Sequence, residues 1–215
     1  MNKTSKLTTL AMLSAISYIV MAVGRIPVVL FLKYDPKDVI ITIGGFIFGP
    51  LSAFVISLLV SFVEMLTVSD TGIIGFVMNV ISTCAFACTA AYIYQRNRTL
   101  KGAIGGLISG SILMTAVMLL WNYIITPIYL GYPREAVVKL LVPAILPFNL
   151  LKAGLNLAIT MLIYKPIVTT LRKSNLISES IQGEQTKKFN PGVMLVSAIV
   201  LVSCILLVLV LNGTI

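Results

Sequence analysis

The most informative charged residue in the sequence is Lys152, which lies in the middle of the apolar segment 142–164. A cation at the centre of a membrane-spanning helix is unfavourable by several kcal/mol unless another group pairs with it. Asn149 lies three residues earlier and so falls on the same helix face. Either Lys152 forms a salt bridge with Glu64 while Asn149 joins two helices, or both side chains hold a polar ligand. We favour the ligand.

Two more asparagines lie inside apolar segments, where an amide side chain needs hydrogen-bond partners. Asn122 stands in the string MLLWNYIITPIY, and its neighbours Trp121 and Tyr123 are also typical of the aromatic belt at a membrane interface. The belt explains the aromatic residues better than it explains Asn122, which we interpret as a ligand contact. Asn79, in the string GFVMNV, fits an interhelical hydrogen bond and a ligand contact equally well.

A short polar segment, FLKYDPKDV at 31–39, carries Tyr34, Asp35 and Asp38 together with two lysines. Taken alone, this composition is typical of a solvated loop. Loops beside a rigid scaffold also carry binding functions, so the segment is a candidate lid over a site at the outer face.

The sequence lacks the residues that most enzymes and metal sites use. It contains no histidine, no phosphate-binding P-loop motif, and no GxSxG or HExxH string. Cys84 and Cys88 share a helix face, but they and Cys204 lie in apolar segments, where cysteine usually behaves as a small hydrophobic residue. A membrane enzyme acting on a lipid or prenyl substrate is disfavoured, because no aspartate cluster lies on the cytoplasmic side. We therefore predict that the protein is not an enzyme and has no cofactor or metal site.

The composition places these residues in a lipid bilayer. Of the 215 residues, 58% are hydrophobic and only 11% are charged, whereas a soluble domain has about 25% charged residues. The apolar segments are 7–23, 39–50, 51–66, 72–94, 102–128, 142–164 and 191–211. The second is shorter than the ~20 residues that span a bilayer, and Gly49-Pro50 separates it from the third. We expect a short helix, a tight break and a longer helix there.

The net charge of +9 arises from basic clusters at the ends of apolar segments, so we expect no nucleic-acid partner. With the N-terminus in the cytoplasm, the inner cations are Lys3, Lys6, Arg96, Arg98, Lys101, Lys165, Arg172, Lys173, Lys187 and Lys188. The outer cations Arg25, Lys33, Lys37, Arg134 and Lys139 are balanced by Asp35, Asp38, Glu64, Asp70 and Glu135. This asymmetry follows the positive-inside rule and predicts a site that opens outward.

We divide the chain into a membrane substrate-binding domain (1–172), a flexible polar linker (173–190) and an additional C-terminal hydrophobic segment (191–215). The linker has little apolar periodicity. The C-terminal segment contains the most lipid-like stretch of the sequence, and we expect it to be a plain anchoring helix, peripheral to function.

Small residues four apart mark faces where helices can approach closely. Ala11 and Ala15 form one such pair, and Gly102, Gly106 and Gly110 form another row. These faces indicate either internal packing or contact with a partner subunit, and the spacing favours neither.

Four strings of the sequence resemble one family of membrane proteins. They are KYDPKDV in the first outer loop, MNV in the fourth major segment, NYIITPIY in the fifth and AILPFNLLKAG in the sixth. Over about residues 7–170 the chain is similar to the riboflavin-specific S components (the RibU family) of energy-coupling-factor (ECF) vitamin transporters. It departs from that pattern in its seventh apolar segment and at Ile40, where the family pattern has proline.

The resemblance implies an all-α integral membrane fold of six helices with a short second helix, a vitamin site near the outer face, and a multi-pass location in the bacterial cytoplasmic membrane. It also implies a transmembrane T subunit and two cytoplasmic ATPase subunits as partners. Ala11 and Ala15 match the family's AxxxA face, which docks on the T subunit. Asn122, Asn149 and Lys152 match positions that hold the flavin. The residues that we predict to bind riboflavin are Asn122, Asn149, Lys152, Asn79, Glu64, Tyr34, Asp35, Asp38 and Tyr123.

Two alternatives remain open at this point. The same fold could bind flavin mononucleotide (FMN) or another vitamin, and FMN would need cations for its phosphate. The candidates for that role are Arg25, Lys33, Lys37 and Arg134. The chain could instead be an ion-coupled secondary carrier with Glu64 and Lys152 as its coupling pair, although no internal repeat typical of such carriers is visible.

Overall fold

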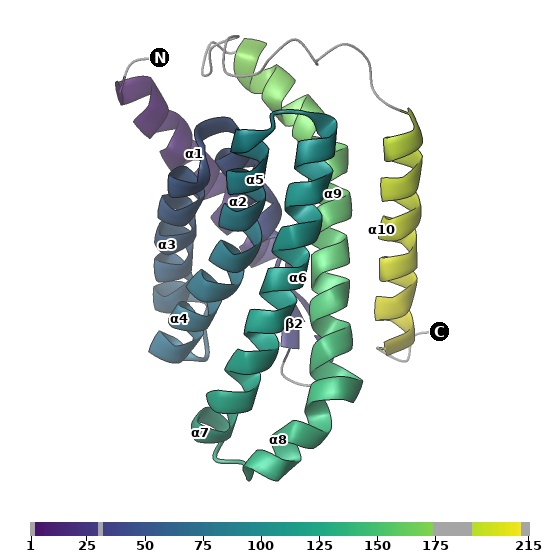
Figure 1. Ribbon diagram of the computed structural model, residues 1–215. Coiled ribbons are helices and arrows are strands. Elements are labelled where there is room, and N and C mark those ends of the chain that lie inside the picture. Colours follow the sequence, from purple (N-terminus) through teal and green to yellow (C-terminus); the bar gives the residue numbers. More distant parts are fainter. Residues whose placement is uncertain (1–2, 30–31, 174–190, 212–215) are drawn as a thin grey trace.

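The computed structural model describes residues 3–29, 32–173 and 191–211, and within them the fold is helical apart from one short hairpin (Figure 1). The hairpin pairs β1 (Ile26–Val29) with β2 (Leu32–Tyr34) in antiparallel register, with Ile26 opposite Tyr34. The helices are α1 (Lys3–Gly24), α2 (Lys37–Phe48), α3 (Pro50–Thr67), α4 (Gly72–Thr83), α5 (Thr89–Arg96), α6 (Leu100–Ile124), α7 (Thr126–Leu130), α8 (Arg134–Leu140), α9 (Leu146–Lys173) and α10 (Pro191–Leu211). π-Helical turns at Cys84–Cys88 and Leu141–Ile145 join α4 to α5 and α8 to α9.

Six helical stretches among the described residues are long and apolar enough to cross a bilayer. They are Lys3–Gly24, Pro50–Thr67, Gly72–Arg96, Leu100–Ile124, Arg134–Thr170 and Pro191–Val210. The predicted all-helical membrane fold is confirmed. The fifth apolar segment ends earlier than predicted because α7, with Pro127 in its first turn, begins a separate helix. The sixth begins earlier, at Arg134, where charged residues of α8 interrupt the apolar pattern.

The short helix α2 forms the centre of the bundle. Every residue from Lys37 to Ile47 is buried, and the helix contacts α1, α3, α5 and α9. It ends at Phe48, the capping residue Gly49 has a φ of +95° that suits glycine, and Pro50 then occupies the first turn of α3. The predicted short helix, break and longer helix are therefore confirmed. Because protein surrounds α2, the helix does not need the length that lipid would impose.

The glycine row on α6 serves internal packing. A Cβ added at Gly106 would lie 2.7 Å from the carbonyl oxygen of Ala90, and one at Gly110 would lie 2.5 Å from that of Phe86. Both carbonyls belong to the helix formed by α4, the π-helical turn and α5, so α6 packs directly on its backbone. Gly102 lies close to Asn97 instead, at the turn that precedes α6.

The C-terminal helix α10 lies along α9 (Figure 1). Its Leu201, Cys204 and Val208 pack on a buried cluster that includes Tyr34 and Phe148, so the helix touches the hairpin end of the bundle as well as lipid. Its opposite face is exposed and apolar, as expected of a membrane anchor. Of the predicted linker 173–190, Lys173 ends α9 and the remainder lies outside the described residues.

Gly105 and Gly106 are adjacent in α6, yet only Gly106 approaches another helix, so they form a matched pair for a packing test. Nothing lies within 4 Å of a Cβ added at Gly105. We expect Gly106→Ala to lower the free energy of unfolding by about 1–3 kcal/mol through overpacking. Gly105→Ala should raise it by up to about 1 kcal/mol through higher helix propensity. Thermal unfolding in detergent measures both effects, and equal shifts would contradict the described packing.

Candidate functional site

A cavity of about 330 Å³ lies at the hairpin end of the bundle, between the hairpin, α3, α4, α6 and α9. This volume falls within the roughly 300–1,000 Å³ typical of small-molecule sites. The apolar side chains in the wall are Leu32, Ile74, Met78, Met118, Trp121, Ile125 and Phe148. The uncharged polar side chains in the wall are Ser69, Thr71, Asn79, Ser82, Asn122, Thr126, Tyr129 and Asn149. A small molecule with both an apolar part and several hydrogen-bonding groups matches such a lining.

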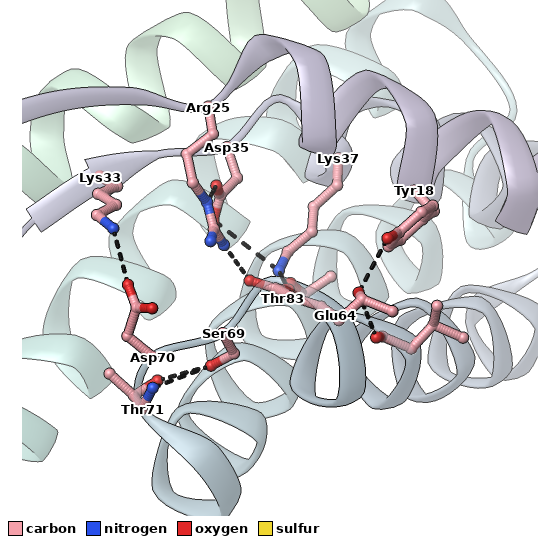
Figure 2. Close-up of polar contacts among 12 residues, drawn as sticks. Tyr18, Arg25, Lys33, Asp35, Lys37, Glu64, Ser69, Asp70, Thr71 and Thr83 are labelled. Carbon is pink, nitrogen blue, oxygen red and sulfur yellow. Dashed lines mark hydrogen bonds and ion pairs between the residues drawn. The ribbon is translucent and has the colours of Figure 1, made fainter.

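Glu64, in α3, lines one side of the cavity and is only 1% exposed. Arg25, which follows α1, and Lys37, at the start of α2, both donate hydrogen bonds to it. Arg25 also donates through Nε to Oδ1 of Asp35 at 2.8 Å. Figure 2 shows these four side chains pointing toward one another. They connect α1, the segment after the hairpin, α2 and α3 at a single point.

Asp38 organises a second group of contacts beside the first. Its Oδ2 lies 3.2 Å from Nζ of Lys152 and accepts a hydrogen bond of 3.2 Å from the amide of Asn156, which like Lys152 belongs to α9. Its Oδ1 accepts a hydrogen bond of 2.6 Å from the hydroxyl of Thr83 in α4. Tyr34 donates to the amide oxygen of Asn156 at 3.1 Å. The alternative salt bridge between Lys152 and Glu64, which we did not favour, is not formed. Arg25 and Lys37 contact the oxygens of Glu64, and Asp38 pairs with Lys152.

The polar segment after the hairpin is a structural element and not a solvated loop. Lys37 and Asp38 are 0% exposed and Asp35 is 5% exposed. Burial on its own would raise the pKa of the Asp35 carboxyl, but the nearby cations Lys37, Lys152 and Arg25 outweigh that effect and hold the pKa below its usual value. Lys33 differs from its neighbours: it lies at the mouth of the cavity and pairs with Asp70 at 3.3 Å, with both side chains exposed (Figure 2).

The charges of this network add up to zero. The three cations are Lys37 and Lys152, which are buried, and Arg25, which is 17% exposed, and the three buried carboxylates are Asp35, Asp38 and Glu64. Removing one partner from such a set leaves an uncompensated charge in a medium that solvates it poorly. The network therefore fixes the ends of the helices around the cavity.

The asparagines face the cavity with part of their hydrogen-bonding capacity unused. Asn122 donates to the carbonyl of Met118 at 2.8 Å and accepts from the hydroxyl of Thr126 at 2.9 Å. Asn149 donates to the carbonyl of Ile145 at 2.8 Å, and its amide oxygen accepts no hydrogen bond from the described residues. Each amide nitrogen has a second hydrogen. Both side chains, 2% exposed, can therefore bind a ligand without rearranging.

Six of the nine predicted ligand-binding residues line the cavity: Asn79, Asn122, Asn149, Lys152, Glu64 and Asp35. Tyr34 and Asp38 do not. They lie behind the wall, where they position Asn156 and Lys152. Tyr123 also lies outside the lining, 40% exposed, with the guanidinium of Arg134 stacked 5.4 Å from its ring centre.

Sequence reasoning did not assign a ligand role to several lining residues. Met118 and Thr126 line the cavity on either side of Asn122, and the spacing of four residues along the chain is a signal that could have identified them. Phe148 also lines the cavity, and its place next to Asn149 in the ILPFNLLK string is a second signal of this kind. Nothing in the sequence marked Asp70 as a lining residue, because its contact with Lys33 joins segments that are distant in the sequence.

Ala11 and Ala15 are both exposed on α1. The residues of α1 that pack into the bundle, Thr9, Leu13, Ser17 and Met21, lie on another face of the helix. The alanine face is therefore open to lipid or to another subunit.

The network gives a prediction about stability. Glu64→Gln removes one buried charge and leaves Arg25 and Lys37 short of a carboxylate, so the free energy of unfolding should fall by about 3–5 kcal/mol. The matched control is Asp70→Asn, which breaks the exposed pair with Lys33 and should change stability by less than about 1 kcal/mol. Unfolding in detergent distinguishes the two, and a Glu64→Gln variant as stable as the parent would show that the buried pairing is unimportant.

Comparison with known proteins identifies the family to which this fold belongs. A family model described as the substrate-specific component of ECF transporters matches residues 5–164. The riboflavin transporter RibU of Streptococcus thermophilus is 32% identical over 185 residues, covering 80% of this chain and 87% of that protein. RibU of Staphylococcus aureus is 28% identical over 183 residues, covering 80% of this chain and 95% of that protein. The riboflavin transporter FmnP of Bacillus subtilis is 27% identical over 190 residues, covering 81% and 99%.

A solved structure described as the S component of a bacterial ECF transporter superposes with a TM-score of 0.68 at 28% identity, covering 80% of this chain and 99% of that chain. The helical fold, its membrane spans and the family match agree with one another. The chain belongs to the family of substrate-specific components of ECF transporters, and is a multi-pass membrane transport subunit and not an enzyme.

Proposed function

We propose that this subunit captures riboflavin in the cavity at the hairpin end of the bundle. The observation that carries the proposal is the pair of buried amides, Asn122 and Asn149, next to the apolar side chains Trp121 and Phe148 in the cavity wall. Relatives that share about four-fifths of the chain are riboflavin transporters by name. At 27–32% identity, these relatives support a ligand of the flavin class, and the identity of the ligand is a matter for experiment.

The chemistry of the flavin fits this lining. The isoalloxazine ring is flat and largely apolar, and one edge carries an N–H between two carbonyl groups. An asparagine amide can accept from that N–H and donate to an adjacent carbonyl. The ribityl hydroxyls can bond to Lys152 and to the polar residues nearer the mouth. A ligand without these groups would leave buried amides unpaired, which gives selectivity.

As an ECF S component, the subunit works with an ECF module. We propose that this module consists of a T subunit and two cytoplasmic ATPases, with the N-terminus of this chain in the cytoplasm and the cavity facing outward. The buried network argues against an ion-coupled carrier that uses Glu64 and Lys152 as a coupling pair. These two residues do not pair with one another, because each is held by other partners.

The direct test of the ligand is the absorption spectrum of the protein purified in mild detergent, followed by titration with riboflavin. Bound flavin, or stoichiometric quenching of riboflavin fluorescence, supports the proposal. A colourless protein that quenches no riboflavin fluorescence would overturn the riboflavin assignment, and other vitamins would then be titrated.

The amides give a second prediction. Asn122→Ala and Asn149→Ala should each weaken riboflavin binding by about 1–3 kcal/mol, or roughly 5- to 150-fold, because a buried hydrogen-bonding edge of the ligand loses its partner. Tyr123→Ala is the matched control, since this polar aromatic residue lies outside the lining, and its affinity should stay within about twofold of the parent. If both asparagine variants bind riboflavin as the parent does, the site assignment is incorrect.

Docking on the T subunit is tested separately. Ala11→Trp or Ala15→Trp places a large side chain on the exposed alanine face of α1, which should prevent close helix approach. Riboflavin binding by the purified subunit should be unchanged, while uptake by cells that contain the ECF module should be lost. Ile112→Trp, at a position 66% exposed on α6, is the control and should support uptake. Normal uptake with both alanine variants would place the docking surface elsewhere.

A further inference from the structure

We propose that Asp70 makes the cavity selective for a neutral flavin over its phosphate ester, by holding the one cation at the mouth that a phosphate could otherwise use. The inference rests on the proposed function and assigns a specificity-determining role to a residue outside the predicted site. Three observations carry it: the pairing of the lining cations, the exposure of the mouth, and the position of Asp70 (Figure 2).

Every cation in the wall of the cavity already has a carboxylate partner. Arg25 contacts Asp35 and Glu64, and Lys152 contacts Asp38. Lys33, the third lining cation, pairs with Asp70 at 3.3 Å. The three lining carboxylates, Asp35, Glu64 and Asp70, balance the three lining cations. A phosphate dianion that enters this lining therefore adds charge with no unpaired cation to receive it.

Two of the four cations considered for a phosphate do not belong to the lining. Lys37 is fully buried against Glu64, and Arg134 stacks on Tyr123 outside the cavity wall. Arg25 has unused N–H donors, but Asp35 and Glu64 already offset its charge, so a phosphate bound there would lie beside two carboxylates. Lys33 is the remaining candidate.

The mouth is also where a phosphate would lie. The side chains of Lys33 and Asp70 are 44% and 82% exposed, whereas Glu64 and Lys152 are 1% and 8% exposed. Phosphate is the most strongly hydrated part of FMN, so it occupies the wet end of the cavity and leaves the ring to the apolar wall. There it meets Asp70, which repels it and competes for Lys33. An exposed ion pair is weak, so removing Asp70 frees Lys33 without disturbing the fold.

The test is a gain of binding. Riboflavin and FMN are titrated against the purified chain and against Asp70→Asn, by quenching of flavin fluorescence at low and high salt. We expect the parent to prefer riboflavin, and Asp70→Asn to bind FMN about three- to tenfold more tightly at low salt. The gain should disappear at high salt because it arises from exposed charges. Riboflavin affinity should stay within about twofold, because riboflavin carries no charge.

Two further variants make the result specific. In Lys33→Gln/Asp70→Asn the gain should be lost, because the freed cation is gone. Glu135→Gln removes an exposed carboxylate outside the lining and should leave the FMN to riboflavin ratio unchanged. Riboflavin binding with an unchanged FMN to riboflavin ratio in Asp70→Asn would overturn the role of Asp70 and leave the proposed function intact. Failure of the parent to bind riboflavin would instead overturn the proposed function itself.

Discussion

Six charged side chains, five of them buried and Arg25 partly buried, lie together at the hairpin end of this membrane protein. They are stable there only as a neutral set. The members come from five parts of the chain: Arg25 follows α1, Asp35 follows the hairpin, Lys37 and Asp38 begin α2, Glu64 lies near the end of α3, and Lys152 lies in α9. Pairing them requires the ends of these elements to converge. Apolar packing alone would fix the position of one helix along another much less firmly. In lipid, helix association gains nothing from excluding water.

The ligand cavity is a consequence of this convergence. Glu64 and Lys152 are held by the network on one side and line the cavity on the other. Asn122 and Asn149 also line the cavity and present amide groups whose orientation is fixed by hydrogen bonds to their own helices. The polar groups are therefore in place before a ligand enters, which reduces the ordering that binding would otherwise require. Because the lining charges balance, the same arrangement favours a ligand without charge.

Much of the fold could be predicted from the sequence because lipid imposes simple rules on length and polarity. The break at Gly49-Pro50 and the convergence of Asn122, Asn149 and Lys152 also follow from local features, namely a glycine–proline pair and polar residues within apolar segments. The pairing of the charges could not be predicted. Whether Lys152 meets Asp38 or Glu64 depends on how α2 is rotated between α3 and α9, which is decided by contacts between distant segments. For the same reason the segment 31–39 appears solvated from its composition, although Lys37 and Asp38 are fully buried. Tyr123 was assigned to the site by its neighbours in the sequence, yet its position on α6 turns it away from the cavity.

We propose that a neutral flavin occupies the cavity between the buried amides and the charge network, and an experimental structure of the chain with riboflavin bound would decide this. We expect the isoalloxazine ring against Trp121 and Phe148, with its polar edge about 2.7–3.2 Å from the amide of Asn122 or Asn149. All six charges of the network should still be paired. Riboflavin bound elsewhere on the protein, or a ring edge that contacts neither asparagine, would contradict this proposal.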